Sequence, residues 1–155
     1  MDVNGIDKRR LILSTEQTMK MHLNLAVSDL AKSVSFYRAL LQQPPAKRYD
    51  DYALFVCDAP AVELALDLAS HPIIEADAHY GIAVTSAETV RETAERLKAG
   101  GYRADVELDE TCCYARQTKV WTSDPDGRRW ETYVVHEETE ERNDDRACCE
   151  STCGV

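Results

Sequence analysis

The chain has 155 residues, of which 44% are hydrophobic, and this is enough for one domain or for two small fused modules. Its formal net charge is −10, but much of the excess follows residue 136, so the remainder is only mildly acidic and nucleic acid is not an expected partner. A membrane span is not expected either, because no apolar run approaches the roughly 20 residues that a transmembrane helix requires.

Residues 1–18 show neither the apolar core nor the cleavage pattern of a signal peptide, so we treat them as an N-terminal extension and expect a cytoplasmic protein. Residues 19–70 predict a first module with one helix and four strands. Alternating apolar residues indicate the strands, and apolar residues at helical spacing indicate the helix. The predicted elements are a strand at 20–27, a helix at 30–41 and strands at 46–49, 52–57 and 62–68.

Residues 71–77 are taken as a linker, and residues 78–136 repeat the same order of elements. The predicted elements are a strand at 79–85, a helix at 87–99 and strands at 102–108, 114–122 and 129–136. The Asp-Pro-Asp-Gly run at 124–127 is a strong turn signal between the last two strands. Residues 137–155 are expected to form an acidic, cysteine-containing flexible tail. The fold class is therefore α+β, with two tandem βαβββ modules.

A histidine opens the same short phrase in the first strand of each module, His22-Leu-Asn-Leu-Ala-Val-Ser and His79-Tyr-Gly-Ile-Ala-Val-Thr. A lone histidine there is usually a polar edge residue, but two at matching positions, both pointing away from the helices, favour a metal site. Glu131, just inside the last strand, is a candidate third ligand. Two histidines and one carboxylate leave coordination positions open, as in non-haem ferrous oxygen chemistry. Glu63 is an open candidate for a fourth ligand, and the alternative is a solvent-exposed edge glutamate.

Five of the six cysteines are clustered, which favours thiol chemistry in a reducing compartment over a disulfide framework. Cys112 and Cys113 are adjacent, so both can bind one centre only where the backbone leaves regular strand geometry. Paired thiolates favour trivalent arsenic, cadmium, zinc or copper(I). A chance pair, with one cysteine buried and one exposed, is the alternative. Cys148, Cys149 and Cys153 form either an accessory soft-metal site or part of an ordinary disordered tail.

These motifs resemble the vicinal oxygen chelate superfamily, which includes glyoxalases, extradiol dioxygenases and fosfomycin-resistance proteins. Within it, the chain is similar to the ArsI-type organoarsenical carbon–arsenic lyases and the related cadmium-induced proteins. The resemblance covers about residues 20–136, and the double cysteine is its most specific element. The segments that carry the closer match are Met21–Val27, Thr111–Ala115, Lys119–Trp121 and Arg129–Tyr133.

The resemblance implies mixed sheets around a metal-binding cavity, in which His22, His79 and Glu131 bind Fe(II). It also implies that Cys112 and Cys113 hold a trivalent organoarsenical, whose carbon–arsenic bond is cleaved with O2 to give inorganic arsenite. The polar segment 106–114 is expected to be a mobile loop that carries the arsenic. The protein is expected to be a monomer or a homodimer.

Two other functions stay open at this point. One is a glyoxalase-like metal-dependent lyase or transferase, which a fourth ligand at Glu63 would favour. The other is a non-enzymatic cadmium- or arsenic-binding protein, for which the cysteines alone would suffice.

Overall fold

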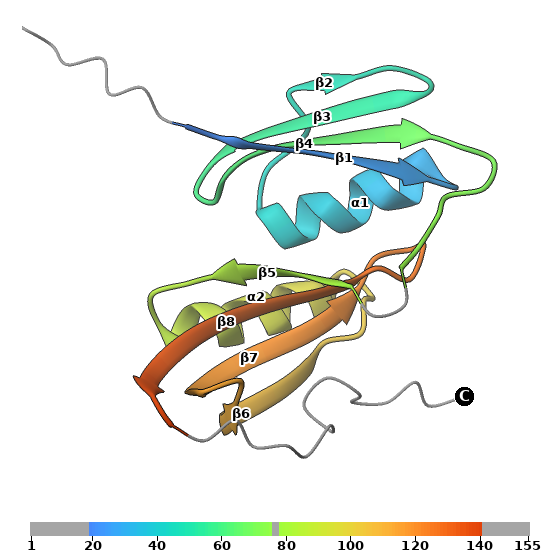
Figure 1. Cartoon of the computed structure of the whole chain (residues 1–155). Helices are drawn as coiled ribbons and strands as arrows, with labels where there is room; N and C mark the ends of the chain where they lie inside the picture. Colours follow the sequence, from blue (N-terminus) through green and yellow to red (C-terminus); the bar gives the residue numbers. More distant parts are fainter. Residues whose placement is uncertain (1–18, 76–77, 141–155) are drawn as a thin grey trace, which may run out of the picture.

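The structure, a computed structural model, describes residues 19–75 and 78–140 as two four-stranded sheets, each with one helix against it (Figure 1). The first module consists of β1 (Met21–Val27), α1 (Leu30–Leu41), β2 (Lys47–Arg48), β3 (Tyr52–Asp58) and β4 (Ala61–Leu68). The second consists of β5 (His79–Ala83), α2 (Ala87–Ala99), β6 (Asp105–Cys112), β7 (Ala115–Ser123) and β8 (Arg129–Glu138). Neither helix of the described chain has the length and apolar character needed to cross a membrane.

Both sheets have the same topology. The strand orders are β1-β4-β3-β2 and β5-β8-β7-β6. In each module the first strand pairs in parallel with the last one, and the remaining pairs are antiparallel. These two mixed sheets confirm the predicted α+β fold with a repeated βαβββ unit.

Both helices begin at a residue whose side chain caps the helix. The Asp29 carboxylate accepts a hydrogen bond from the backbone N–H of Lys32 at 3.0 Å, and this bond lowers the pKa of Asp29. Ser86 accepts from the N–H of Thr89 at 3.1 Å in the same way. The capped helices cover the same residues that the apolar spacing predicts, 30–41 and 87–99.

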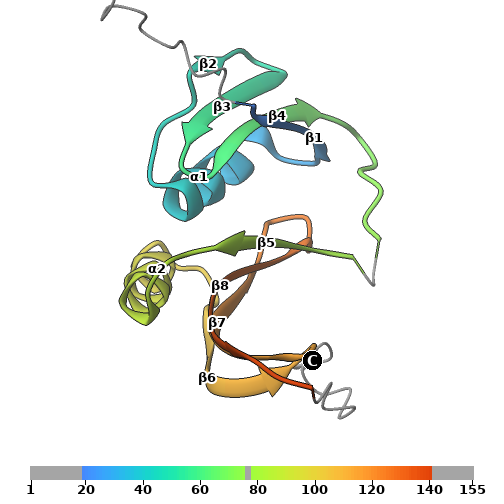
Figure 2. The ribbon, with the colours of Figure 1, turned by 60° about the vertical axis from the view of Figure 1, so that its left-hand side comes forward.

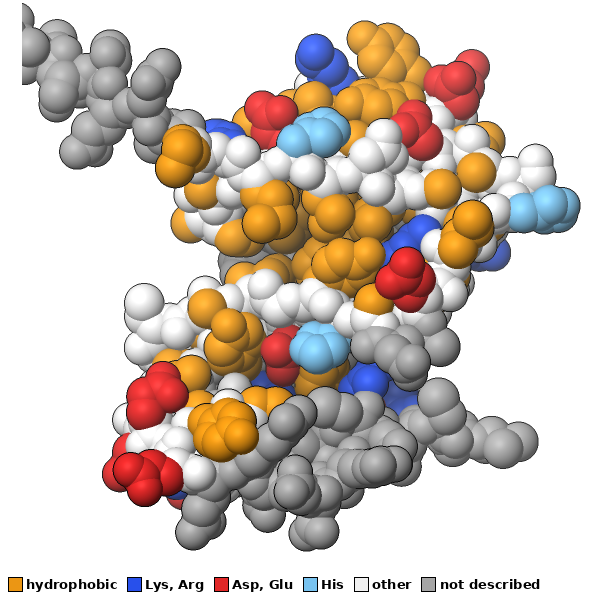
Figure 3. Space-filling view, viewed as in Figure 1, with side chains coloured by type: hydrophobic (Ala, Val, Ile, Leu, Met, Phe, Trp, Pro, Cys, Tyr) orange, Lys and Arg blue, Asp and Glu red, His pale blue; other side chains and the backbone are white. Residues whose placement is uncertain are grey.

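Helix α1 lies between its own sheet and the second module, as both ribbon views show (Figures 1 and 2). The fully buried Phe36 and Tyr37 of α1 contact aromatic residues of the second module. Phe36 packs edge-on against Tyr102 at a centroid distance of 5.1 Å, and Tyr37 against Trp130 at 5.7 Å. Hydrophobic side chains accordingly gather where the modules meet (Figure 3), and one core runs through both.

The turn at 124–127 fastens the two modules together through polar contacts, and we call these contacts the turn clamp. The Tyr37 hydroxyl donates to Asp124 at 2.7 Å in a buried site. Burial, followed by the charge of Asp124, holds the pKa of Tyr37 well above its usual value. The N–H of Ser28 donates to Asp126 at 3.1 Å, while Arg128 pairs with Asp124 at 3.1 Å and donates to a carbonyl of β1. These contacts fix how the modules of one chain sit relative to each other.

The boundaries differ most from the sequence prediction in β6 and β8. The predicted strand at 102–108 is wrong in position, because β6 covers residues 105–112. Most of the expected loop at 106–114 is therefore strand. An irregularity between Glu107 and Glu110 breaks the alternation and hides this strand from a pattern search. The tail was expected from residue 137, whereas β8 continues to Glu138. The tail cysteines Cys148, Cys149 and Cys153 lie outside the described residues, as do residues 1–18.

Candidate metal and thiol site

His79 and Glu131 meet on the face of the second sheet opposite α2. Strand β5 pairs in parallel with β8, which places Gly81 opposite Glu131 and His79 two residues earlier, on the same face of the sheet. The His79 Nε2 atom lies 3.6 Å from Glu131 Oε1. Two protein atoms that each bind one metal ion at about 2.0–2.2 Å can be up to about 4 Å apart. The two side chains therefore fit as ligands of a common ion.

Gly81 leaves the space that the Glu131 side chain occupies. A Cβ atom at this position would lie 3.1 Å from Glu131 Oε1 and 3.1 Å from Tyr133 Cε1. Such contacts are tighter than ordinary van der Waals packing, so any other residue would require the Glu131 carboxylate and the Tyr133 ring to shift by a few tenths of an ångström. The lack of a side chain at position 81 therefore makes room for Glu131 in the site.

Lys119 is a buried cation beside the candidate ligands. Its side chain is only 4% exposed, and its Nζ lies 3.6 Å from Glu131 Oε2. The indole of Trp121 packs edge-on against His79 at 5.2 Å, and Lys119 lies 5.4 Å from its centroid. Sequence reasoning assigned Lys119 no role. The signal was present, because strand alternation places it on the face that Trp121 and Gln117 share.

The vicinal cysteines form the end of the β6–β7 hairpin. Cys112 closes β6 and pairs with Ala115, so Cys113 and Tyr114 form a two-residue turn. Both turn residues have positive φ, 56° for Cys113 and 67° for Tyr114, a region that asparagine and glycine occupy at lower cost. In this turn the two sulfur atoms lie 3.1 Å apart. Cys112 is buried and Cys113 is exposed, and both are thiols.

One pocket of about 330 Å³ joins the cysteine pair to His79 and Glu131. Its floor is the open face of β7, where the Gln117 amide donates to the carbonyl of Cys112 at 3.3 Å. Its lining residues are His79, Cys112, Cys113, Ala115, Gln117, Lys119, Trp121, Glu131, Tyr133, Val135 and Glu138. Four of the five residues that the sequence nominated for the site are therefore brought together within the second module.

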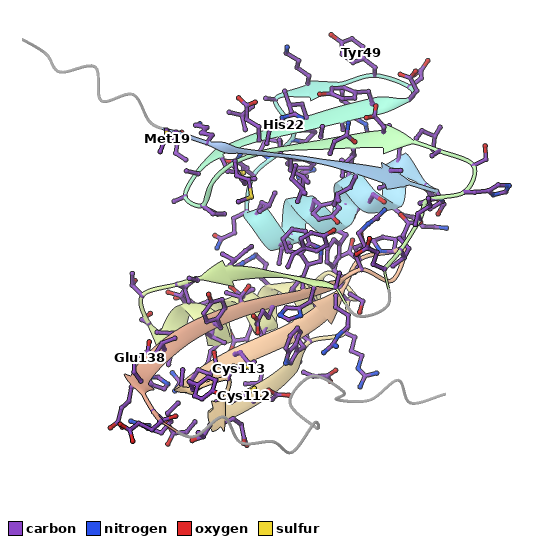
Figure 4. All side chains as sticks on the ribbon, in the orientation of Figure 1. Met19, His22, Tyr49, Cys112, Cys113 and Glu138 are labelled. Carbon is purple, nitrogen blue, oxygen red and sulfur yellow. The ribbon has the colours of Figure 1, made fainter. Side chains whose placement is uncertain are left out.

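His22 lies elsewhere, on the open face of the first sheet. It stands directly opposite Glu63, and its Nδ1 lies 3.7 Å from Glu63 Oε2. These side chains are 57% and 44% exposed. Figure 4 shows His22 on β1, well separated from Cys112 and Cys113 on the second module. Within residues 19–75 and 78–140, no three histidine, cysteine or acidic side chains lie close enough together to hold a metal ion.

The remaining histidines lie away from this pocket. His71 lies in the segment between the modules and lines a second hollow of about 440 Å³ there, together with Arg128 and Tyr80. His136 lies on β8, where its Nε2 is 2.8 Å from the Thr118 hydroxyl.

The repeated fold agrees with the class of protein that the comparisons show. The chain belongs to the glyoxalase/bleomycin resistance protein/dioxygenase superfamily, whose family model matches residues 21–132. A glyoxalase/bleomycin resistance protein/dioxygenase from Alicyclobacillus acidocaldarius has a TM-score of 0.61 at 18% identity, over 77% of this chain and 92% of that one. The fosfomycin resistance protein FosX of Listeria monocytogenes has a TM-score of 0.61 at 20% identity, over 76% and 93%. These structures share the fold.

Relatives of higher identity carry more specific names. A trivalent organoarsenical cleaving enzyme of Thermomonospora curvata is 39% identical over 84% of this chain and 87% of its own length. The enzyme of the same name from Bacillus sp. (strain MD1) is 36% identical over 83% and 80%. The cadmium-induced protein CadI of Mycobacterium tuberculosis is 37% identical over 78% and 79%.

Proposed function

We propose that this chain cleaves the carbon–arsenic bond of trivalent organoarsenicals and releases inorganic arsenite, using Fe(II) held by His22, His79 and Glu131. The observation that carries this proposal is the pocket in which the two thiols face the same space as His79 and Glu131. The names of the organoarsenical-cleaving relatives support it.

Cys112 and Cys113 would bind the arsenic. A trivalent methyl- or phenylarsenical in water carries two exchangeable hydroxyl groups. Each thiol loses its proton and replaces one hydroxyl, which leaves as water, while the carbon–arsenic bond stays intact. Sulfur atoms 3.1 Å apart suit one shared centre, since soft centres bind each sulfur at about 2.3 Å. Thiols that must stay reduced also agree with the expected cytoplasmic location.

His79 and Glu131 would supply two of the three metal ligands, and their 3.6 Å separation fits a common ion. Two imidazoles and one carboxylate are the usual ligands of non-haem ferrous iron, which supplies activation of dioxygen when it is bound. The Lys119 ammonium lies beside Glu131 Oε2 and so leaves Oε1 turned towards His79. Trp121 and Tyr133 line the space beside these groups and would keep water from the organic group.

The third ligand, His22, would come from a second copy of the chain. The turn clamp and the shared aromatic core hold the two modules of one chain in an arrangement that separates His22 from His79. The open sheet faces of both modules remain available, and each carries part of a ligand set. In a twofold homodimer, the first module of each chain would face the second module of its partner and complete two equal sites.

The test is release of arsenite from trivalent methylarsenical by protein loaded anaerobically with Fe(II), with and without O2. Three variants accompany it, all with Cys148, Cys149 and Cys153 replaced by serine so that these three thiols do not contribute to arsenic binding. Glu131→Ala is expected to bind the arsenical and release no arsenite. Cys112→Ser is expected to lose binding, and exposed Tyr49→Phe serves as the control. Release that continues in Glu131→Ala would overturn the proposed site.

A glyoxalase-like lyase or transferase is the second candidate, favoured by the contact between His22 and Glu63. The 3.7 Å separation suits a shared ion as well as the pair in the second module does. Glu63 would then be a fourth ligand and would leave less room for oxygen. A non-enzymatic cadmium- or arsenic-binding protein would instead bind the arsenical tightly and release no arsenite after confirmed iron loading.

A further inference from the structure

Two β-bulges lie side by side in the second sheet, just before the cysteine turn. In β6, the pairs Glu107–Lys119 and Glu110–Gln117 leave two residues opposite Thr118 alone. In β8, the register against β7 shifts by one residue between Arg116 and Gln117, and the extra residue is His136. Both bulges thus flank the same short stretch of β7.

The bulge in β6 determines which face of the sheet Cys112 occupies. Side chains alternate along a strand, so one extra residue reverses the face of everything that follows it. Glu107 stands opposite Lys119, and beyond the bulge Cys112 stands opposite Ala115. Ala115 and Lys119 both line the pocket. In a continuous register, Cys112 would point to the helix-covered face, away from His79 and Glu131.

The Thr118 hydroxyl joins the two bulges. It accepts a hydrogen bond from the backbone N–H of Asp109 at 3.2 Å and lies 2.8 Å from His136 Nε2. Asp109 has a φ of 58°, a strained value for a residue other than glycine, so the bulge needs such a partner to persist. Arg116 adds an ion pair to the Asp109 carboxylate and lies 3.4 Å from Glu137, across the same two strands.

We propose that Thr118 is a positioning residue for the cysteine pair. Its hydroxyl lies on the face of β7 opposite the pocket and contacts both bulges. These contacts keep the hairpin in the register that places Cys112 in the pocket. Thr118 contacts neither arsenic nor metal, and this inference rests on the proposed role of the cysteines in binding arsenic.

The experiment compares Thr118→Val, which keeps the side-chain shape and loses the hydroxyl, with Thr118→Ser, which keeps it. Thr122→Val is the matched control. Thr122 is a buried threonine on the same strand and face, and its hydroxyl has no hydrogen-bond partner within the described residues. All proteins are full-length and carry serine in place of the three tail cysteines. Phenylarsine oxide binding is measured by calorimetry, and the alkylation rate of Cys112 is measured by site-resolved mass spectrometry.

Thr118→Val is expected to bind phenylarsine oxide about tenfold more weakly, which corresponds to about 1.4 kcal/mol. Its Cys112 should also be alkylated about tenfold more slowly, because without the bulge this thiol turns from the pocket to the helix-covered face of the sheet. Thr118→Ser and Thr122→Val are expected to behave as the parent protein. His136→Leu, at an exposed position, removes one of the two bonds and should give a smaller change in the same direction.

Parental binding and parental Cys112 alkylation in Thr118→Val would overturn the inference. Equal losses in Thr122→Val would overturn it as well, because the effect would then belong to strand packing in general. If the parent protein itself does not bind phenylarsine oxide, the proposed function fails. The alkylation rate of Cys112 then still decides the role of Thr118.

Discussion

In the first module, His22 and Glu63 stand directly opposite each other on paired strands, whereas in the second module Glu131 lies two residues further along its strand than the position opposite His79. The exposure of the pairs differs too. The Glu63 side chain is 44% exposed, and that of Glu131 is 12% exposed. The same strand order therefore leaves the glutamate of the pair half-exposed on the first sheet and mostly buried on the second.

The second module also contains the features that form the pocket. Its last three strands carry two bulges, a buried lysine and a strained turn with two thiols. In the described part of the first module, β2 has only two residues and β3 and β4 pair without a register shift. If the proposed function holds, the repeated fold divides the roles unequally: the first module would supply one metal ligand, and the second module would form the pocket around the site.

The largest expected difference between the modules concerns their glutamates. Glu131→Ala should weaken Fe(II) binding by more than about a hundredfold, because it removes a proposed ligand. Glu63→Ala should weaken it by only about tenfold, because the carboxylate would orient the His22 ring as a neighbour of a ligand. Anaerobic titration with Fe(II) measures both. Equal losses would make the two modules equivalent donors and favour the four-ligand, glyoxalase-like reading.

Mixing two inactive variants tests which copies form one site. His22→Ala and Glu131→Ala should each lack activity as homodimers. In a heterodimer that shares its sites between chains, one site would combine the intact first module of one chain with the intact second module of the other. A statistical mixture formed by co-refolding should then recover up to about a quarter of wild-type arsenite release. No recovery, with heterodimers verified by native mass spectrometry, would assign each site to a single chain.

The sequence was sufficient for the repeated fold because its signals are local. Alternation, helical spacing and the caps at Asp29 and Ser86 are each readable within a few residues. The pairing of His79 with Glu131 could be anticipated from the parallel first and last strands of a βαβββ unit. Those parts of the site follow from one module alone.

The parts that could not be anticipated depend on register and on contacts between modules. The bulge in β6 adds one residue to its pairing with β7, and the broken alternation makes this strand look like a loop. The contact of Tyr37 with Asp124 joins residues 87 positions apart, and no local pattern announces it. That contact is one of several that join the modules in an arrangement that separates His22 from His79. Equivalent positions in a repeat therefore did not imply that the side chains meet.

Gly81 and Asn24 occupy equivalent positions, two residues after the histidine, and substitution by alanine separates their roles. Gly81→Ala should push Glu131 away from His79, weaken Fe(II) binding about tenfold and destabilise the fold by about 1–3 kcal/mol. Asn24→Ala removes only an exposed hydrogen bond to Asp67 and should leave iron affinity unchanged. Calorimetric melting and Fe(II) titration measure the two effects. Unchanged iron affinity in Gly81→Ala would show that Glu131 tolerates the displacement.

The contact between the modules gives the smallest expected effect and a pH signature of its own. Tyr37→Phe removes a buried hydrogen bond to Asp124 and should lower the free energy of unfolding by about 1–2 kcal/mol at pH 8. The pKa of Tyr37 is raised in the folded state, chiefly by burial, so the unfolded chain releases this proton first as the pH rises. The stability that Tyr37 contributes is therefore complete below about pH 10 and is lost as the pH rises above it.

Urea unfolding between pH 8 and 11 should show that the difference in the free energy of unfolding between wild type and Tyr37→Phe shrinks as the pH rises. Exposed Tyr49→Phe should show no such trend, and a constant difference for Tyr37→Phe would mean that this hydroxyl is not protected by the module interface.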